Sequence, residues 1–297
     1  MSNLQKISWI GPGKVGRTLG RALKQAGYQV GAVVHRKKEA AKDAVEFIGA
    51  GTPGTDLLAS LDSESIHFIT ANDDSIPSLV KEIDTKGPAS LEGHYFYHTS
   101  GALSSSVFDA LKKKKAETGS IHPLQVFADP AKALETLPGI YYAIEGSDKA
   151  MELAIQMVDK LQGKLLLIPT GRKILYHVAG VFAANYLTVL VQLAMSVMEE
   201  IGESPEDAYQ AMLPLMVSAL QNIEEFGTEG ALTGPISRGD TKTVKDHVAA
   251  LQQLRPEILR AYQVLGEEAA EMSLRGGKIS VEKAREFLKI LSQSDES

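Results

Sequence analysis

The sequence contains no cysteine and only one tryptophan among its 297 residues. Without thiols the chain can form neither disulfides nor thiolate metal sites, and it cannot use a cysteine nucleophile. A basic surplus is missing as well, because the formal net charge is −6. A nucleic-acid partner would require a basic face that displaces counterions from phosphates. We therefore expect a protein that binds no nucleic acid.

The apolar stretch before the first glycines spans only four residues, which is too short for a signal core, so we expect no secretory signal there. We expect a cytoplasmic protein. The one long uncharged run covers residues 178–198, which is the length of a membrane span. It contains polar residues such as Asn185 and has no second counterpart, so we expect a helix buried on most sides of a helical domain, with no membrane partner.

A nucleotide-binding pattern stands at the start of the chain. A short apolar strand over residues 7–10 runs into glycines, and a helical pattern opens directly behind them. Gly11 allows a tight turn, Gly13 lets the backbone approach a pyrophosphate, and Gly16 lets the helix pack against the strand. The phosphate would sit on the helix N-terminus. The cofactor loop that we expect comprises Gly11, Pro12, Gly13, Lys14, Val15 and Gly16; the alternative is a ligand-free glycine turn.

The end of the second predicted strand, residues 29–34, distinguishes between the two dinucleotide cofactors. NAD sites place an acidic residue about 20 positions after the glycines, whereas a basic residue there accommodates a 2′-phosphate. The residue at this distance is Arg36, and Lys37 follows it. We therefore expect NADP rather than NAD; the alternative is an exposed basic loop without a ligand.

Strand and helix patterns alternate as far as Ile168, which predicts a doubly wound, mostly parallel α/β sheet. From there on only helical patterns occur. We expect a dinucleotide-binding domain over residues 1–169 and an all-helical substrate and dimerisation domain over residues 170–297. In such sheets ligands bind beyond the carboxyl ends of the strands. Three residues follow predicted strands at that edge, namely Asn72, Ser100 and Gly101. They either contact the cofactor or the substrate, or they are ordinary turn and cap residues.

Two histidines and an asparagine are candidates for catalysis. His122 stands at a predicted strand end before a proline, where a neutral imidazole can act as acid or base; the alternative is a structural loop histidine. His177 and Asn185 lie on one side of the first helix of the second domain, two turns apart. Their side chains either line a ligand-binding groove or form hydrogen bonds to backbone groups inside a protein core. No third ligand accompanies His94 and His98, so we expect no metal site.

The segment LTGPISRGD, residues 232–240, interrupts the helices of the second domain with glycines and a proline. Arg238 in this loop can clamp a substrate carboxylate through two hydrogen bonds. Asp240 can cap the following helix or orient Arg238. The alternative is an ordinary interhelical loop.

The motifs GPGKVG, HTSGA, SIHPLQVF, YHVAGVFAANYL and LTGPISRGD together span most of the chain. As a set they resemble NADP-dependent oxidoreductases that join a Rossmann-like domain to an all-helical domain. That family is similar in architecture to pyrroline-5-carboxylate reductase, to prephenate dehydrogenase, and to the β-hydroxyacid and 6-phosphogluconate dehydrogenases. The resemblance implies that the helical domain completes the active site and forms a homodimer.

Within this resemblance, His122-Pro123 is similar to the histidine-proline motif of prephenate dehydrogenase, whose histidine is catalytic, and Ser100 resembles the serine after the preceding strand. The chain departs from the β-hydroxyacid dehydrogenases at Val181, which replaces their catalytic lysine four residues before the asparagine. His177 or Lys173, a turn or two away, would then replace it.

These observations predict an NADP(H)-dependent oxidoreductase that acts on a small carbonyl or imine compound, expected to carry a carboxylate. Hydride would move between the substrate and the nicotinamide, with His122 or His177 as proton donor, Asn185 polarising the acceptor and Arg238 holding the carboxylate. The competing hypothesis is an NADPH-binding or sensing protein without turnover, because a sensor could keep every cofactor contact.

Overall fold

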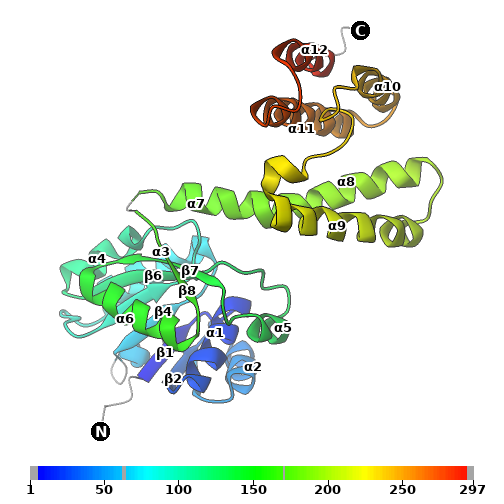
Figure 1. The fold of residues 1–297 in the computed structure, drawn as a ribbon. Coiled ribbons are helices and arrows are strands. Elements are labelled where there is room, and N and C mark those ends of the chain that lie inside the picture. Colours follow the sequence, from blue (N-terminus) through cyan, green and yellow to red (C-terminus); the bar gives the residue numbers. More distant parts are fainter. Residues whose placement is uncertain (1–5, 62–64, 170, 293–297) are drawn as a thin grey trace. The chain divides into compact units, whose positions relative to one another are not determined.

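The computed structural model describes residues 6–61, 65–169 and 171–292. The chain divides into two units, residues 1–186, built on a β-sheet, and residues 187–297, built from helices. The sheet has eight strands in the order β3-β2-β1-β4-β5-β6-β7-β8 (Figure 1). All neighbouring strands run parallel except β6 and β7, which are antiparallel. The predicted doubly wound, mostly parallel sheet is therefore confirmed.

The strands cover short segments of the first unit. They are β1 (Lys6–Ile10), β2 (Gln29–Val34), β3 (Thr52–Gly54), β4 (Ile66–Ile69), β5 (Tyr95–His98), β6 (Glu117–Pro123), β7 (Tyr141–Gly146) and β8 (Lys164–Leu167). The helices of the sheet unit are α1 (Lys14–Gln25), α2 (Lys38–Ile48), α3 (Ile76–Lys86), α4 (Asp109–Lys113), α5 (Pro130–Glu135), α6 (Asp148–Lys160) and α7 (Lys173–Gly180). Short 3-10 turns lie at Leu58–Leu61, Asp73–Ser75 and Ser105–Phe108.

Each face of the sheet carries its own hydrophobic core, because successive side chains of a strand point to opposite faces. Ile7 and Trp9 of β1 pack with Leu19 of α1 and Leu153 of α6. Ile10, the next residue of β1 after Trp9, packs on the other face with Val80 of α3. Burial on both faces explains the nearly continuous apolar strands, which are typical of parallel sheets.

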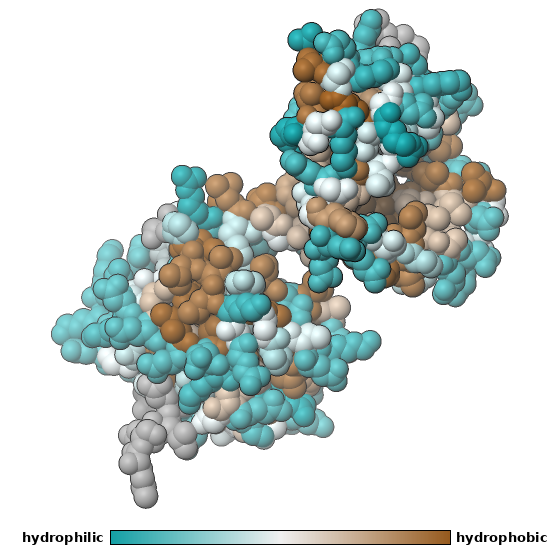
Figure 2. All heavy atoms as spheres, viewed as in Figure 1, coloured by the Kyte–Doolittle hydropathy of each residue, from teal (hydrophilic) through white to brown (hydrophobic). Residues whose placement is uncertain are grey.

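The expectation of a buried helix over residues 178–198 is wrong for the single chain. After α7 a π-helical turn (Val181–Tyr186) leads into α8 (Leu187–Glu200), and large apolar side chains along this stretch are exposed, with Phe182 at 64% and Val189 at 52%. Figure 2 shows such hydrophobic residues on the outside of the helix that Figure 1 labels α7. The apolar composition predicts that the helix is buried, but it does not show whether residues of the same chain or of another molecule bury it.

In the part of the chain that the structure describes, one helical stretch, Lys173–Glu200, is long and apolar enough to cross a membrane by length and composition. Helices that pack into the interior of a protein assembly meet the same two criteria. The observation is weak evidence for a membrane span.

The remaining helices are α9 (Pro205–Ala231), α10 (Thr241–Leu251), α11 (Pro256–Arg275) and α12 (Val281–Leu291). Two of these helices begin with a serine cap, because Ser204 accepts a hydrogen bond from the Asp207 amide and Ser280 accepts one from the Lys283 amide. Val244 and Phe287 lie in the buried core that α10, α11 and α12 form. The segment 232–240 is the loop between α9 and α10.

Candidate active site

A cavity of about 640 Å³ opens at the carboxyl ends of β1, β2 and β4. Four residues that the sequence predicts for cofactor binding line it, namely Gly11, Gly13, Arg36 and Asn72. Pro12, Lys14, Val15 and Gly16 continue the same loop into α1, and Lys37 precedes α2. The edge of the sheet therefore brings most of the predicted cofactor residues to one place.

The three glycines differ in what a side chain would meet. Gly11 has φ +66°, and a Cβ there would lie 2.7 Å from the Cβ of Ala71. A Cβ on Gly16 would collide with the Thr70 hydroxyl, whereas a Cβ on Gly13 would have nothing within 4 Å. Gly11 thus makes the turn, Gly16 allows close packing, and Gly13 leaves the cavity open for a ligand.

Three features of this cavity suit a phosphate-bearing ligand. Helix α1 begins after Gly13 without a side-chain cap and without an acidic residue in its first turn, so its first N–H groups remain available to an anion. The Thr70 hydroxyl is buried and has no hydrogen-bond partner. Arg36 is exposed in the loop after β2 and lines the cavity.

A second cavity, also of about 640 Å³, contains three of the predicted catalytic residues. His122 from β6, His177 from α7 and Asn185 from the π-helical turn all line it. The rest of the lining is mainly apolar, and among its described residues there is no lysine, arginine, aspartate or glutamate. Its polar groups are two imidazoles, a phenol and two amides.

Gly101 explains how the two histidines come together. A Cβ on Gly101 would lie 2.6 Å from Nδ1 of His177 and 2.9 Å from Nε2 of His122. One nitrogen of each imidazole therefore approaches the same point beside the backbone that follows β5. The structure places Gly101 with the histidines rather than in the lining of the first cavity.

A tyrosine that the sequence analysis did not single out orients His122. The Tyr176 hydroxyl lies 2.7 Å from Nδ1 of His122, and the two rings meet edge to face. Burial lowers the pKa of His122 to about 4, helped by the positive charge of Lys173 and by His177. Burial raises the pKa of Tyr176 to about 12. At neutral pH both groups are uncharged.

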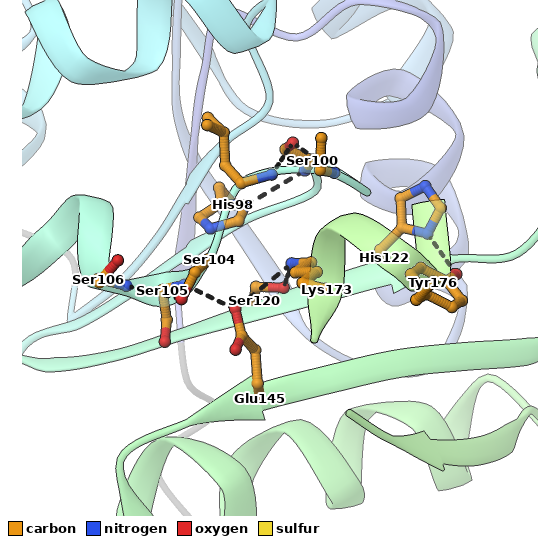
Figure 3. Close-up of polar contacts among 12 residues, drawn as sticks. His98, Ser100, Ser104, Ser105, Ser106, Ser120, His122, Glu145, Lys173 and Tyr176 are labelled. Atoms are coloured by element: carbon orange, nitrogen blue, oxygen red, sulfur yellow. Dashed lines mark hydrogen bonds and ion pairs between the residues drawn. The ribbon is translucent and has the colours of Figure 1, made fainter. Parts of the chain in front are cut away.

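A buried ion pair lies beside the histidines (Figure 3). The Lys173 ammonium donates to the Ser120 hydroxyl and lies 3.7 Å from Oε1 of Glu145. The same carboxylate oxygen accepts a 2.7 Å hydrogen bond from the Ser105 amide. Burial lowers the pKa of Lys173 to about 8, while the carboxylates of Glu145 and Asp73 oppose that fall. Lys173 therefore remains mainly protonated at pH 7.

Ser100 is engaged within its own turn. Its hydroxyl donates to Oδ2 of Asp73 at 2.8 Å and accepts from the amides of Ala102 and Leu103 at 3.1 and 2.9 Å. The Ser100 amide in turn donates to Nδ1 of the buried His98. These contacts shape the backbone that carries Gly101.

Arg238 belongs to the helical unit, where it is exposed in the loop between α9 and α10. The neighbouring Asp240 caps α10, since its carboxylate accepts from the Thr243 amide at 3.1 Å and from the Thr243 hydroxyl at 2.7 Å. Of the two alternatives for Asp240, the structure shows the helix cap.

Some site residues carried only faint signals in the sequence. Tyr176 directly precedes His177, which was already a candidate, and Glu145 is the one charge in an apolar strand. Ser120 has no such signal. These residues are separated from their partners by at least 25 positions, for example 53 positions between Lys173 and Ser120.

Two family models match the chain. A Rossmann-like domain model matches residues 2–123, and the model of domain of unknown function DUF2520 matches residues 140–269. No curated protein sequence matches the chain.

Solved structures resemble the whole chain. Protein TM1727 from Thermotoga maritima is 25% identical, with a TM-score of 0.68 over 89% of this chain and 98% of that one. BF3122 from Bacteroides fragilis, assigned as an NADP oxidoreductase, is 21% identical, with a TM-score of 0.71 over 90% and 98%. A reductive aminase from Aspergillus terreus, in complex with NADPH and ethyl-5-oxohexanoate, is 17% identical, with a TM-score of 0.58 over 97% and 93%. The chain therefore matches a Rossmann-like domain model in its first part and the DUF2520 model after it, and the second match begins at the last two strands of the sheet.

Proposed function

We propose that this protein is an NADP(H)-dependent oxidoreductase that transfers hydride to or from a small carbonyl or imine compound. One observation carries the proposal: both cavities open along the same edge of one sheet. The glycine loop follows β1 and His122 lies at the end of β6, with β4 and β5 between them. Three steps between neighbouring strands correspond to about 14 Å. A ligand bound at the glycines can thus extend toward the histidines.

The first cavity suits NADP(H). Gly13 and the open N-terminus of α1 would hold the pyrophosphate, and Arg36, with Lys37 beside it, would hold the 2′-phosphate. Asn72 would contact a ribose or phosphate oxygen. Two of the similar solved structures are described as an NADP oxidoreductase and as an NADPH complex. When bound, the cofactor supplies or accepts the hydride.

The residues of the second cavity divide the remaining tasks. With a pKa of about 4 for His122, only about one molecule in a thousand carries the imidazolium at pH 7. His122 therefore orients the substrate as a neutral hydrogen-bonding group, and His177, half-buried beside the same point, donates the proton. Asn185 polarises the acceptor atom, and Ser100 holds the turn that places Gly101 between the histidines.

We assign the cofactor-binding role to residues 1–169 and the substrate and dimerisation roles to residues 170–297. A substrate carboxylate would be held by Arg238, since the described lining of the second cavity offers no lysine or arginine. The second copy of a homodimer would cover the exposed apolar side chains of α8 and α9. These include Val189, Leu215, Leu220 and Phe226, and exposed apolar side chains on two neighbouring helices are typical of an interface.

Two measurements test the function. NADPH binding is followed by the fluorescence of the nicotinamide, and NADPH oxidation is followed across a panel of ketoacids, imines and semialdehydes. His122→Gln and His177→Gln should each lower turnover far more than they weaken NADPH binding. A protein that binds NADPH tightly and consumes it with no member of the panel would favour the sensing function instead.

His247 provides a matched control for these variants. Its Nδ1 lies 2.9 Å from the Tyr262 hydroxyl, and the two rings meet edge to face as those of His122 and Tyr176 do. It belongs to the helical unit and lines neither of the two cavities. His247→Gln should therefore keep the wild-type turnover, and an equal loss in all three variants would contradict the assignment.

A further inference from the structure

Lys173 is the first residue of α7 and is only 2% exposed. A buried ammonium is costly unless its charge and its hydrogen bonds are satisfied. Lys173 meets this requirement through Ser120 on β6 and Glu145 on β7. These two residues stand directly opposite each other in the antiparallel ladder, so the ammonium lies over one cross-strand pair.

The same helix and strand make a second contact one step further along. His122 follows Ser120 by two positions on β6 and therefore shares its face. Tyr176 follows Lys173 by three positions on α7 and therefore lies about one turn away on a similar face. Helix α7 is thus joined to β6 at two successive points, Lys173 on Ser120 and Tyr176 on His122. His177, the next residue, lies against Gly101.

We propose that Lys173 is the positioning residue of this site: its buried contact with Ser120 and Glu145 sets the start of α7, and thereby places Tyr176 on His122 and His177 beside Gly101. The catalytic consequence rests on the function proposed above, whereas the positioning does not. Lys173 lines neither cavity. It acts through the two residues one turn further along its helix.

The charge of Lys173 has a second effect on the same histidine. The titratable groups around the ammonium are Glu145 from β7, Asp73 from the turn after β4, His98 from β5 and His122 from β6. The positive charge lowers the pKa of both histidines in addition to the effect of burial. Besides positioning His122, Lys173 therefore adds to the effect of burial in keeping the imidazole neutral.

The decisive experiment is the titration of His122 by NMR in the full chain, in the wild type and in Lys173→Met. Removing the charge should raise the His122 pKa by about one unit. In the wild-type background, Tyr176→Phe should change the His122 ring signals. In the Lys173→Met background it should have much less effect, because the hydrogen bond between Tyr176 and His122 should already be lost there. Where turnover is measured, Lys173→Met should lower kcat about tenfold or more, with the Kd for NADPH changed less than twofold.

Lys149→Met is the matched control. Lys149 also pairs with a strand glutamate, Glu117 of β6, at 3.4 Å from its Oε1, but the Lys149 side chain is 70% exposed. It should leave both the His122 titration and kcat unchanged. If Lys173→Met does not fold, Lys173→Met/Glu145→Gln removes both charges at once, and its His122 signals are compared with the wild type in the same way.

A folded Lys173 variant with the wild-type His122 pKa and the wild-type response to Tyr176→Phe would overturn the proposal. The NMR measurement needs no substrate. A protein that shows the expected titration but oxidises no NADPH would refute the proposed function and leave the positioning role intact.

Discussion

Gly101→Ala should uncouple the two histidines without disturbing the backbone. Gly101 is not among the glycines with positive φ, so alanine can adopt its conformation. The new methyl carbon would lie 2.6 Å from Nδ1 of His177 and 2.9 Å from Nε2 of His122. Carbon and nitrogen atoms that are not bonded require about 3.5 Å. Both imidazoles must therefore retreat, His177 by about 0.9 Å and His122 by about 0.6 Å.

His177 is the ring that we expect to move further. The Tyr176 hydroxyl holds His122 at 2.7 Å, whereas His177 is half-buried and borders the open second cavity. Overpacking of this kind costs about 1 to 3 kcal/mol, and the low end applies because one neighbour can swing into open space. A catalytic group displaced by 1 Å can lower the rate about a hundredfold. We therefore expect kcat to fall by about that factor, with a small loss of stability.

The assay compares kcat, the Kd for NADPH and the urea unfolding midpoint of Gly101→Ala with those of Gly13→Ala. A Cβ on Gly13 has nothing within 4 Å in the protein but enters the first cavity. Gly13→Ala should therefore weaken NADPH binding, whereas Gly101→Ala should spare it. Wild-type kcat in Gly101→Ala, with unshifted histidine NMR signals, would refute the convergence of the two histidines on Gly101.

Three further predictions concern the cofactor, acid stability and assembly. In fluorescence titrations, Arg36→Ala should weaken NADPH binding about 10- to 100-fold, as expected for a lost hydrogen bond to a charged group. It should leave NADH binding unchanged. An equal loss of affinity for NADPH and NADH would argue against the 2′-phosphate contact. Burial lowers the pKa of His67 to about 3. Below pH 6.5 His67 is therefore protonated in the unfolded chain but stays neutral in the folded chain. His67 therefore lowers the unfolding free energy by about 1.4 kcal/mol per pH unit as the pH falls below 6.5, and urea unfolding of His67→Gln at pH 6 and pH 5 should show a slope smaller by that amount. Leu215 is 64% exposed on α9 and lies on the proposed dimer surface. Leu215→Glu should therefore shift the protein from dimer to monomer in light scattering. A wild-type protein that is monomeric at micromolar concentration would contradict the homodimer.

Most of the sheet could be predicted from the sequence because its strands are local apolar runs between helical patterns. The strand over residues 29–34 has the predicted bounds, and the strand predicted at 7–10 begins one residue earlier, at Lys6. Strand β3 was not predicted. It consists of Thr52, Pro53 and Gly54 only; proline and glycine are disfavoured in strands, and three residues are too few to show an alternating pattern. Pairing with the neighbouring β2 at the edge of the sheet creates this strand.

The candidate site could be predicted only in part, because strand ends are local features and side-chain contacts are not. His122 could be identified from its place at a strand end. Its partner Tyr176 lies 54 positions away, and no pattern in one sequence pairs the two. The low pKa of His122 likewise depends on burial and on a lysine that the fold brings close. The sequence therefore left the two candidates for the proton donor open, and the choice of His177 is our proposal.

The ion pair beside the histidines argues for a role beyond stability. A buried pair such as Lys173 and Glu145 contributes no more to folding than well-packed apolar residues of similar volume. Two apolar side chains would therefore attach the start of α7 to the sheet equally well. They would not supply a positive charge next to His98 and His122, whose pKa values that charge lowers. The charge adds to burial in lowering the His122 pKa, so the ion pair widens the pH range over which the imidazole is neutral.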